Sequence, residues 1–190
     1  MKIQRRPSTF LLPVPAALIT VAAPKGPGNI VTLAWVGTVC SAPPMLGIAV
    51  RPSRYSYELL RQKNEFVVNV PRADQVELVD LCGTVSGRDS DKFALTGFHP
   101  MPAANVSAPL IEECPVNLEC LTRHRLSLGA HDLFIGEIVA AHFNEDVVDG
   151  RGRLDKSRLD PLAYVDGEYW SLKEKVGSYG FAKKRLGGKK

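Results

Sequence analysis

The sequence predicts a mostly β protein, a six- or seven-stranded antiparallel barrel with a few short helices. Residues 116–128 alternate between apolar and polar side chains, with Leu121 the only exception, which is typical of an antiparallel strand with one buried face. Short apolar runs bounded by glycines and prolines surround this segment, as in strands joined by tight turns. The β-α-β alternation of a parallel sheet is absent from the sequence.

The first half of the chain is expected to contribute four strands. A turn at residues 24–28, rich in glycine and proline, separates the first two strands. Pro43 and Pro44 end the second strand, because proline cannot donate to a ladder. We expect these strands at residues 17–23, 30–39, 46–51 and 65–70.

Two helices are predicted in the same half of the chain. The first covers residues 54–63 and follows Ser53, which we expect to be its N-cap. The second covers residues 74–82, begins at the capping residue Asp74 and stops at Gly83.

The second half continues with strands. Residues 129–132 are predicted to form a hairpin turn that leads from the alternating strand into a strand at 133–143. That strand is apolar on both faces, which suits a barrel wall packed against a helix or a second subunit. Two short strands, at 163–165 and 169–171, flank a turn.

The basic character of the chain lies largely in its C-terminal tail. The formal net charge of the chain is +4. Five cations near the C-terminal end account for more than this charge, so the remainder of the chain is slightly acidic. A solvated tail is therefore expected, and binding to nucleic acid is not. The length suits one domain, which we place at residues 1–175, before a basic tail at 176–190. The five cations are Lys183, Lys184, Arg185, Lys189 and Lys190.

Cysteine and histidine spacing gives no metal-binding pattern. The sequence contains neither a C-x-x-C pair nor an H-E-x-x-H motif, so we expect no metal site. The cysteines lie in apolar surroundings, which favours buried, reduced thiols. No apolar run resembles a signal-peptide core or a membrane span, so we expect a soluble, cytoplasmic protein. The cysteines are Cys40, Cys82, Cys114 and Cys120.

Small side chains form one face of the segment from residue 30 to residue 40. Such side chains let a flat group approach the strand backbone, whose N–H and C=O groups can then bond it. A plain core strand beside a closely packed neighbour is the alternative. The face consists of Thr32, Ala34, Val36, Thr38 and Cys40.

Residues 51–56 and 86–93 each combine cations with hydroxyl groups at the start of a helix. Free backbone N–H groups at a helix N-terminus attract phosphate, and arginine adds a charged fork. The second segment also has the composition of an anion-binding nest. Capping by Ser53 with solvated arginines explains the first segment equally well, and an ordinary charged surface loop explains the second.

Taken in order, these motifs closely resemble those of the flavin reductase-like family, whose fold is the FMN-binding split barrel. The resemblance covers about residues 8–175 and is greatest toward the flavoredoxins and the ferric and flavin reductases. It implies an antiparallel split β-barrel that binds FMN and pairs as a homodimer. The motifs are Asn29-Ile-Val-Thr32-Leu-Ala-Trp35, Pro43-Pro44, Arg51-Pro-Ser-Arg54-Tyr-Ser56 and Ser86-Gly-Arg-Asp-Ser-Asp-Lys92-Phe93.

The resemblance also implies which residues contact FMN. Backbone groups of the segment from Val31 through Thr38 to Cys40 would bond the polar edge of the isoalloxazine ring. Ser56 stands where the family often has threonine, which keeps the hydroxyl group. Tyr164 stands where the family often has phenylalanine, which keeps the aromatic ring. The side chains beside the ring would be Asn29, Thr32 and Trp35, with His131 and Tyr164 as further contacts. Those around the ribityl phosphate would be Arg51, Arg54, Ser56, Ser86 and Lys92.

The implied activity is that of an FMN-dependent oxidoreductase. It would take electrons from NADH or NADPH and pass them to free flavin, ferric complexes or a partner protein. The chemistry belongs to the cofactor, so no catalytic side chain is required. The sequence lacks the G-x-G-x-x-G fingerprint, so the nicotinamide would bind only transiently. A non-enzymatic FMN electron carrier of the flavoredoxin type is the alternative, and an anion- or nucleic-acid-binding barrel that uses the basic tail ranks below both.

Several single residues have competing interpretations. His131 would either tune the flavin or relay a proton to it, or simply bond the local backbone as a turn residue. We expect His124 and Trp170 to be packed in the core, with an interface as the alternative for His124. Cys40 has no partner for thiol chemistry and is interpreted as packing.

Overall fold

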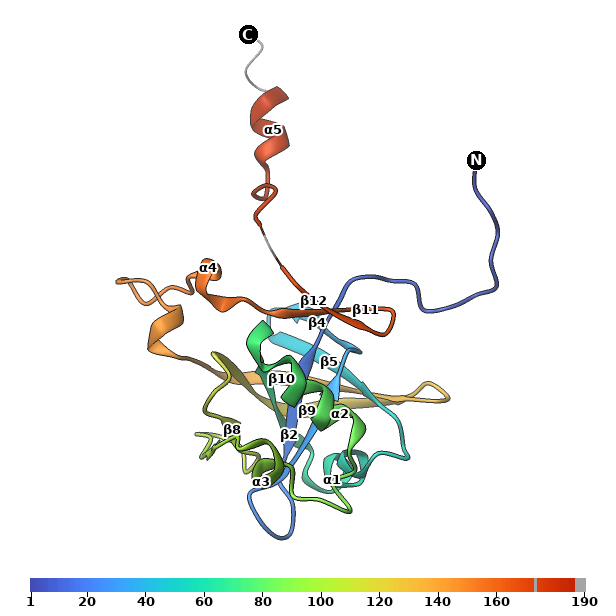
Figure 1. Cartoon of the computed structure of the whole chain (residues 1–190), viewed down its shortest axis with the longest axis vertical. Coiled ribbons are helices and arrows are strands. Elements are labelled where there is room, and N and C mark those ends of the chain that lie inside the picture. Colours follow the sequence, from blue (N-terminus) through green and yellow to red (C-terminus); the bar gives the residue numbers. More distant parts are fainter. Residues whose placement is uncertain (173, 187–190) are drawn as a thin grey trace.

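A seven-stranded antiparallel sheet dominates the computed structural model, which describes residues 1–172 and 174–186. The strand order is β3-β2-β6-β9-β10-β5-β4 (Figure 1). The predicted mostly β class is confirmed. The strands are β2 (Ala17–Val21), β3 (Asn29–Leu33), β4 (Val36–Ser41), β5 (Pro44–Val50), β6 (Glu65–Val70), β9 (Val116–Ser127) and β10 (Asp132–Phe143).

The two edge strands of this sheet, β3 and β4, follow one another in the chain. The sequence predicts one strand over 30–39, but β3 and β4 are separate strands at opposite edges, joined through Ala34 and Trp35. The carbonyl oxygen of Trp35 accepts from the backbone N–H of Ala49 in β5, at 2.9 Å. The chain thus leaves one edge and enters the other, and the break is where the barrel closes.

The strands β2 and β3 are buried on both faces. The inner face of β2, with Ile19 and Val21, contributes to a cluster inside the barrel that includes Phe66 and Phe134. Leu18, on the outer face of β2, packs in a second cluster beneath helices. Within the single chain, the strand β10 alternates between buried and partly exposed positions as far as Glu137, so its second face is not fully covered by a helix. Packing of that face against a second subunit stays a prediction.

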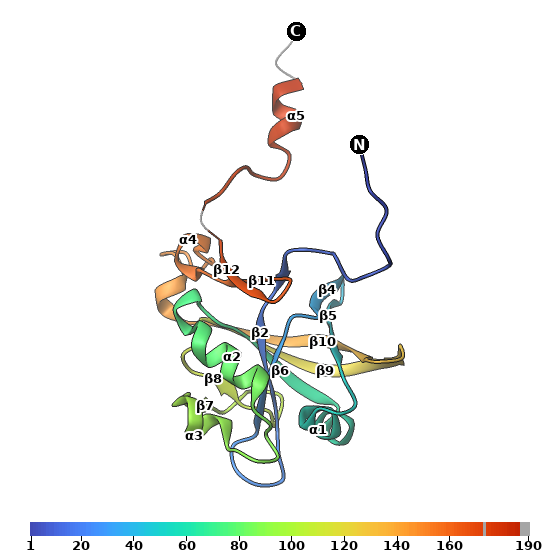
Figure 2. The same ribbon diagram turned by 45° about the vertical axis from the view of Figure 1, so that its right-hand side comes forward.

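The helices pack on opposite sides of β2. The helix α1 (Tyr55–Lys63) contributes Leu59 and Leu60 to the inner cluster, whereas α2 (Val76–Thr84) and α3 (Lys92–Thr96) contact β3. Figure 2 shows α2 and α3 to the left of β2 and α1 to its right. Among the described helices, none is long and apolar enough to cross a bilayer. The other helices are the 3-10 turns η1 (Ala73–Gln75) and η2 (Glu145–Val147), and the helices α4 (Lys156–Leu159) and α5 (Phe181–Leu186).

Both predicted helices start differently in the structure. Ser53 is not the N-cap of α1: the cap position is Arg54, which makes no side-chain capping bond. The predicted start at Asp74 falls within η1, where the Gln75 side chain accepts from the backbone N–H of Arg72. Gly83 lies inside α2, where a Cβ would be 3.2 Å from the Cβ of Thr32, so it permits close packing against β3.

Two small sheets complete the fold. The strands β1 (Val14–Pro15), β11 (Leu162–Val165) and β12 (Glu168–Ser171) form one, and β7 (Pro100–Met101) and β8 (Leu110–Ile111) form the other. The helix α5 stands apart from the sheets in Figures 1 and 2. The domain boundary at residue 175 stays a prediction, and the predicted basic tail lies partly outside the described residues, at 187–190.

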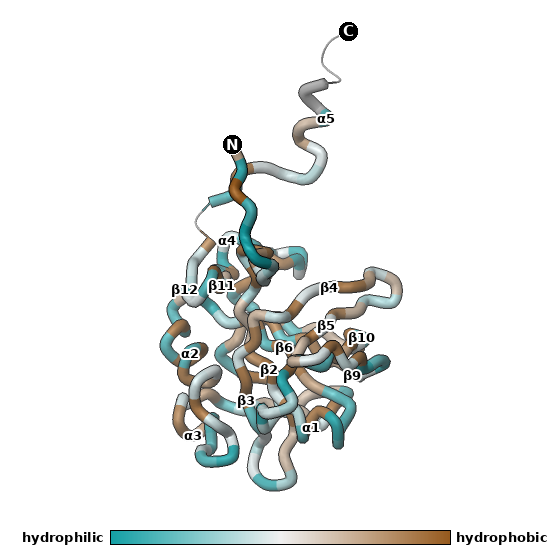
Figure 3. The backbone as a smooth tube through the Cα atoms, turned by 90° about the vertical axis from the view of Figure 1, so that its right-hand side faces the viewer, coloured by the Kyte–Doolittle hydropathy of each residue, from teal (hydrophilic) through white to brown (hydrophobic). Residues whose placement is uncertain are grey.

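Some expectations about burial are wrong. Trp170 is exposed rather than packed in the core, because β12 is an edge strand. His124 is not in the core either, because β9 extends beyond β6 after Leu121, and its place at an interface stays a prediction. Cys82, Cys114 and Cys120 are buried, whereas Cys40 is only partly buried on the edge strand β4. The hairpin of β4 and β5 projects from the body, with hydrophobic residues along β4 (Figure 3).

Candidate functional site

Two adjoining cavities lie where β3, β5 and α1 meet the loop after α2. They share Arg51 and Arg54. The smaller, of about 220 Å³, is here called the polar cavity, and the larger, of about 460 Å³, the aromatic cavity. The polar cavity is lined by Asn29, Val31, Arg51, Ser53, Arg54, Tyr55, Ser56, Val85, Ser86, Gly87, Arg88 and Lys92. The aromatic cavity is lined by Ala16, Thr32, Leu33, Ala34, Trp35, Ala49, Arg51, Arg54, Asp80, Gly83, Thr84, His131, Tyr164, Gly167 and Tyr169.

A buried hydrogen bond connects β3 to the start of α1 in the polar cavity. Asn29 Nδ2 donates to Ser56 Oγ at 2.7 Å, and both side chains are buried. The Ser56 oxygen accepts in this bond, so its hydroxyl proton is oriented to donate elsewhere. Gly87 packs against the same amide, since a Cβ there would lie 1.9 Å from Asn29 Oδ1.

Lys92 brings a buried ammonium group to the polar cavity. It is 4% exposed, and its Nζ donates to Ile30 O at 2.8 Å and to Cys82 O at 2.6 Å. An ammonium has three N–H donors, so one is left for a ligand. Burial lowers the pKa of Lys92 and raises the pKa of the neighbouring Cys82 thiol to about 11, so the thiol stays neutral at neutral pH.

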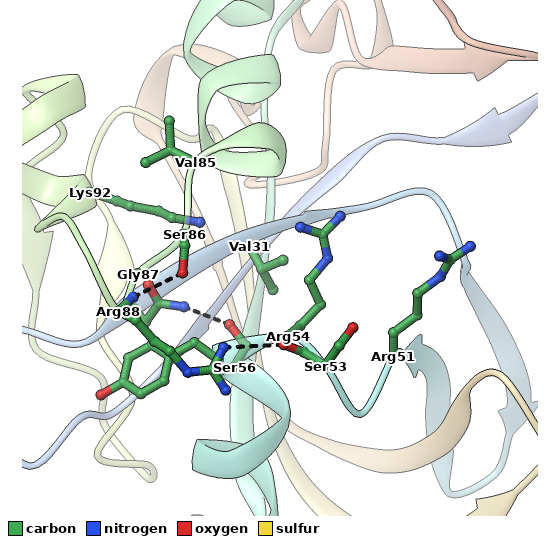
Figure 4. Close-up of a pocket in the computed structure, with 12 residues that line it drawn as sticks. Val31, Arg51, Ser53, Arg54, Ser56, Val85, Ser86, Gly87, Arg88 and Lys92 are labelled. Carbon is green, nitrogen blue, oxygen red and sulfur yellow. Dashed lines mark hydrogen bonds between the residues drawn. The ribbon is translucent and has the colours of Figure 1, made fainter.

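The polar cavity has a strongly positive lining. Figure 4 shows Lys92 reaching in from the α3 side and Arg54 from the α1 side, with Val31 between them. Among the described residues that line it, four are cations and none is a carboxylate. Arg88 alone among the four forms a salt bridge with a carboxylate, that of Glu58. With the N-terminus of α1 beside them, these groups form a site for an anion.

The aromatic cavity is bounded on one side by Trp35 and His131. Their rings meet edge to face, with centroids 6.3 Å apart. The Nε of Arg51 donates to His131 Nε2 at 3.4 Å. Burial, with the Arg51 charge beside the ring, lowers the pKa of His131, so its imidazole is neutral at neutral pH and accepts this bond.

Tyr164 and Tyr169, from β11 and β12, form the other side of the aromatic cavity. Their rings meet edge to face at 5.6 Å, and the Tyr169 hydroxyl donates to Asp80 in α2 at 3.2 Å. Burial, with Asp80 beside the hydroxyl, raises the pKa of Tyr169 to about 12. The gap between the two pairs of rings is lined by small residues and suits a flat group.

Asp132 fixes the hairpin that carries His131. Its side chain is 2% exposed and accepts from the Tyr57 hydroxyl at 2.7 Å and the Ser127 hydroxyl at 2.8 Å. These bonds, together with the Arg125 guanidinium at 3.3 Å, anchor the turn to α1 and β9. They also lower the pKa of Asp132, the hydrogen bond from Tyr57 most of all.

The structure brings together eleven of the twelve residues expected to contact FMN. Thr38 is the exception: it is exposed on β4 and lines neither cavity, because the break after Leu33 carries it to the opposite sheet edge. The polar cavity holds Asn29, Val31, Arg51, Arg54, Ser56, Ser86 and Lys92. The aromatic cavity holds Thr32, Trp35, His131 and Tyr164, as well as the two shared arginines.

Sequence reasoning missed other residues of the cavities. Ser53 and Arg88 lie within the two cationic segments, so those motifs could have identified them. Asp80 and Tyr169 come from segments without a motif and join the aromatic cavity only through tertiary packing.

A family model for the flavin reductase like domain matches residues 9–173. The chain belongs to the flavin reductase-like family. The resemblance inferred from the motifs is therefore confirmed, and so is the split-barrel fold.

Solved structures of this fold include two flavoredoxins. The flavoredoxin of Desulfovibrio vulgaris (Miyazaki F) is 29% identical, with a TM-score of 0.90 over 96% of this chain and 100% of that one. The flavoredoxin from Methanosarcina acetivorans is 34% identical, with a TM-score of 0.90 over 98% and 99%. An uncharacterized protein of Archaeoglobus fulgidus is 33% identical over 142 residues, which are 75% of this chain and 79% of the relative.

Proposed function

We propose that this flavin reductase-like protein binds FMN, with the phosphate in the polar cavity and the isoalloxazine ring in the aromatic cavity. The observation that carries the proposal is the continuity of the two cavities through Arg51 and Arg54. A flat ring that bears a phosphate needs an anion site next to a slot bounded by rings and backbone. The similarity to two flavoredoxins supports a flavin over other ligands of that shape.

The residues of the polar cavity fit a phosphate group. Ser56 has a hydroxyl proton to donate, and Lys92 has an N–H donor beyond the two already bonded. Arg51 and Arg54 supply guanidinium groups, which match phosphate oxygens in pairs. Burial of Ser56 and Lys92 holds both donors in place before the ligand arrives.

We propose that the bound flavin serves an oxidoreductase that accepts electrons from NADH or NADPH and passes them to free flavin, ferric complexes or a partner protein. The flavin supplies the hydride and electron chemistry. The chain supports the ring by its strand backbone and aromatic side chains, and His131 holds the Arg51 guanidinium by accepting its N–H. The open side of the aromatic cavity leaves room for a transient nicotinamide.

The absorption spectrum of the purified protein tests this function. We expect a yellow protein, or one that turns yellow on titration with FMN, whose flavin is bleached by NADH or NADPH under anaerobic conditions. A colourless protein that takes up no FMN would exclude the proposal.

The similarity to the flavoredoxins favours one alternative, a non-enzymatic electron carrier that holds FMN but is reduced by another protein. Anaerobic mixing separates the two functions. A bound flavin that dithionite reduces, and that neither nicotinamide reduces, identifies a carrier.

We also propose that two copies pair as a homodimer through the distal half of β9. Beyond Leu121, β9 has its ladder partner only in β10 among the described strands. Leu126 there is 48% exposed, and Leu128 beside it is 62% exposed. A second copy would cover these side chains, which are unfavourable in water. Sedimentation of the wild type and of Leu126→Glu tests this: we expect a dimer that the substitution dissociates.

A reducing, cytoplasmic location is also proposed. The four cysteines are free thiols, and three of them are buried. Disulfides are rare in the cytoplasm, so free thiols are the state expected there. Fractionation of cells that express the protein, with thiol labelling, tests the location.

A further inference from the structure

The two edge strands of the seven-stranded sheet are protected differently. β3 is mostly buried, with α2 and α3 packed against it. β4, at the other edge, pairs only with β5 among the described strands, and most of its residues are exposed. The side of β4 away from β5 therefore presents backbone N–H and C=O groups to which a further strand can bond.

The exposed edge also lacks charged side chains. Residues 26–50, which include β3, β4 and β5, contain no aspartate, glutamate, lysine or arginine. Exposed sheet edges are usually protected by charged side chains, lysine above all, or are covered by another segment. Val39 is 54% exposed on this projecting hairpin (Figure 3). An uncharged edge with an exposed valine indicates a strand that another segment covers in the assembled protein.

An apolar row connects this edge to the distal half of β9. A Cβ on Gly47 would lie 3.5 Å from the Val39 side chain and 3.0 Å from that of Leu133, so the three residues share one face of the sheet. Leu133 is paired directly with Leu126, which puts Leu126 on the same face. The edge of β4 and the surface proposed above for dimerisation therefore belong to one continuous face.

The first thirteen residues, here called the N-terminal arm, start beside this edge. The arm leads into β1, which contacts β4. All of its residues are exposed, and it projects away from the sheets (Figures 1 and 2). Phe10 is 63% exposed and Leu11 82%. These apolar side chains are unfavourable in water, so the arm also has a surface to bury.

The middle of the arm has the composition of a short strand. Residues 8–12 are uncharged and include threonine and phenylalanine, which favour strands. Pro7 and Pro13 bracket them and cannot donate to a ladder, so these five residues supply the N–H donors. The similarity to the flavoredoxin from Methanosarcina acetivorans covers 98% of this chain and so includes most of the arm. A shared placement for a segment that its own chain leaves exposed favours a contact outside the chain.

We propose that residues 8–12 of one copy add as a further strand along the edge of β4 in a second copy. The proposal rests on the homodimer proposed above. Each arm starts beside its own β4, so a two-fold axis that brings the two edges together also places each arm beside the β4 of the other copy. Main-chain hydrogen bonds would hold the arm, and burial of Phe10 and Leu11 would add to them.

Sedimentation of the wild type and of Leu11→Asp tests the contribution of the arm. We expect the substitution to raise the dissociation constant of the dimer by at least about tenfold, because a carboxylate would be buried in the contact. Val176→Asp is the matched control. Val176 is 95% exposed in the other terminal segment, so this variant should dissociate like the wild type.

Disulfide crosslinking tests the position of the arm. Cys40 is a free, partly buried thiol on β4. Phe10→Cys and Leu11→Cys are made separately, because successive side chains of a strand point to opposite faces. With copper phenanthroline as oxidant, we expect at least one of them to give a covalent dimer on a non-reducing gel. Addition of Cys40→Ser to that variant should abolish the covalent dimer, and Val176→Cys should form none.

The outcomes separate this proposal from the homodimer itself. A wild-type dimer that Leu11→Asp leaves unchanged overturns the arm exchange alone, as does the absence of crosslinking to Cys40 in both cysteine variants. A disulfide formed within one chain also overturns it, because the arm would then cover its own β4. A monomeric wild type overturns the homodimer as well.

Discussion

Lys92 and Cys82 are joined by a hydrogen bond in which the ammonium donates to the carbonyl oxygen of Cys82 at 2.6 Å. The bond connects the first residue of α3 to the last turns of α2. A second bond from the same ammonium reaches Ile30 O in β3. One buried cation thus positions two helices and a strand around the polar cavity while it keeps a donor for a ligand.

We therefore expect Lys92→Ala to weaken FMN binding by roughly 10- to 100-fold, the range for losing one charge-assisted hydrogen bond. Riboflavin binding should change much less, because riboflavin has no phosphate. Titration of both ligands into the variant, followed by flavin fluorescence, measures the difference. Lys63→Ala, an exposed lysine at the end of α1, is the control and should change neither affinity. Equal losses for the two ligands would mean that Lys92 acts on the fold alone.

His131 should titrate at lower pH than an ordinary histidine. Burial is the main cause and the Arg51 charge the second, so Arg51→Gln should raise the pKa of His131. The folded state resists protonation of His131, so its contribution to stability is present above the unfolded pKa and is lost as the pH falls toward the folded pKa. Resonances of the histidine rings followed by NMR against pH measure both effects.

His99 is the internal control for that titration. Its hydrogen bond to Glu113 raises its pKa, so its titration should lie above that of His131 and should not respond to Arg51→Gln. If the His131 curve did not move in Arg51→Gln, the contact at 3.4 Å would not be formed in solution.

Glu119 connects a loop to the main sheet from a fully buried position. It accepts from the backbone N–H groups of Ala104 and Asn105 and pairs with His142 Nε2 at 2.6 Å. Burial alone would raise the pKa of Glu119, but these hydrogen bonds outweigh it, and the net pKa is lowered. We expect Glu119→Gln to lower the free energy of unfolding by about 1–3 kcal/mol at neutral pH.

The pH dependence distinguishes this carboxylate from an ordinary buried group. Because the pKa of Glu119 is lowered in the folded state, its contribution to the stability of the fold is present above the unfolded pKa. That contribution is lost as the pH falls through the folded pKa. The difference in denaturation midpoint between the wild type and Glu119→Gln should therefore shrink in acid. Glu137→Gln removes an exposed pair with Arg123 and should change stability by less than about 1 kcal/mol at any pH. If the difference in denaturation midpoint stayed constant from neutral to acid pH, the lowered pKa assigned to Glu119 would be contradicted.

Local sequence patterns were sufficient to predict most of the strands. The alternation over residues 116–128 and the turn at 129–132 predict β9 and its hairpin with β10 closely. The break at Ala34 and Trp35 could not be predicted, because it follows from the closure of the barrel, which sends one continuous apolar segment to two sheet edges. Periodicity reports which side chains are buried and says nothing about which edge a strand joins.

The candidate site likewise contains some residues that local motifs predict and others that only the fold brings together. Residues such as Ser56 and Lys92 stand in dense local motifs, so their grouping around an anion could be anticipated. Tyr169 has no such motif: it reaches the aromatic cavity because β12 pairs with β11 and its hydroxyl bonds Asp80 in α2. Arg88 lies within a motif, yet its place in the polar cavity depends on Tyr55 and Glu58, which only the fold brings to it.

Gly87 offers a test of the close packing beside the polar cavity. In Gly87→Ala the new methyl group would lie 1.9 Å from Asn29 Oδ1, so the amide must move and its bond to Ser56 must break. Overpacking of this kind costs about 1–3 kcal/mol of stability, and the displaced Ser56 hydroxyl should also weaken FMN binding. Thermal denaturation and FMN titration of the same variant measure the two consequences.

Gly37→Ala is the matched control, because a Cβ at Gly37 meets nothing within 4 Å and its backbone is not in the left-handed region. Gly37 also lies in a strand of the same sheet, where alanine loses less backbone entropy on folding than glycine, so its stability should be unchanged or slightly higher. If Gly87→Ala behaved like Gly37→Ala in both measurements, the loop would be able to move away from Asn29. The close approach at Gly87 would then have no bearing on FMN binding.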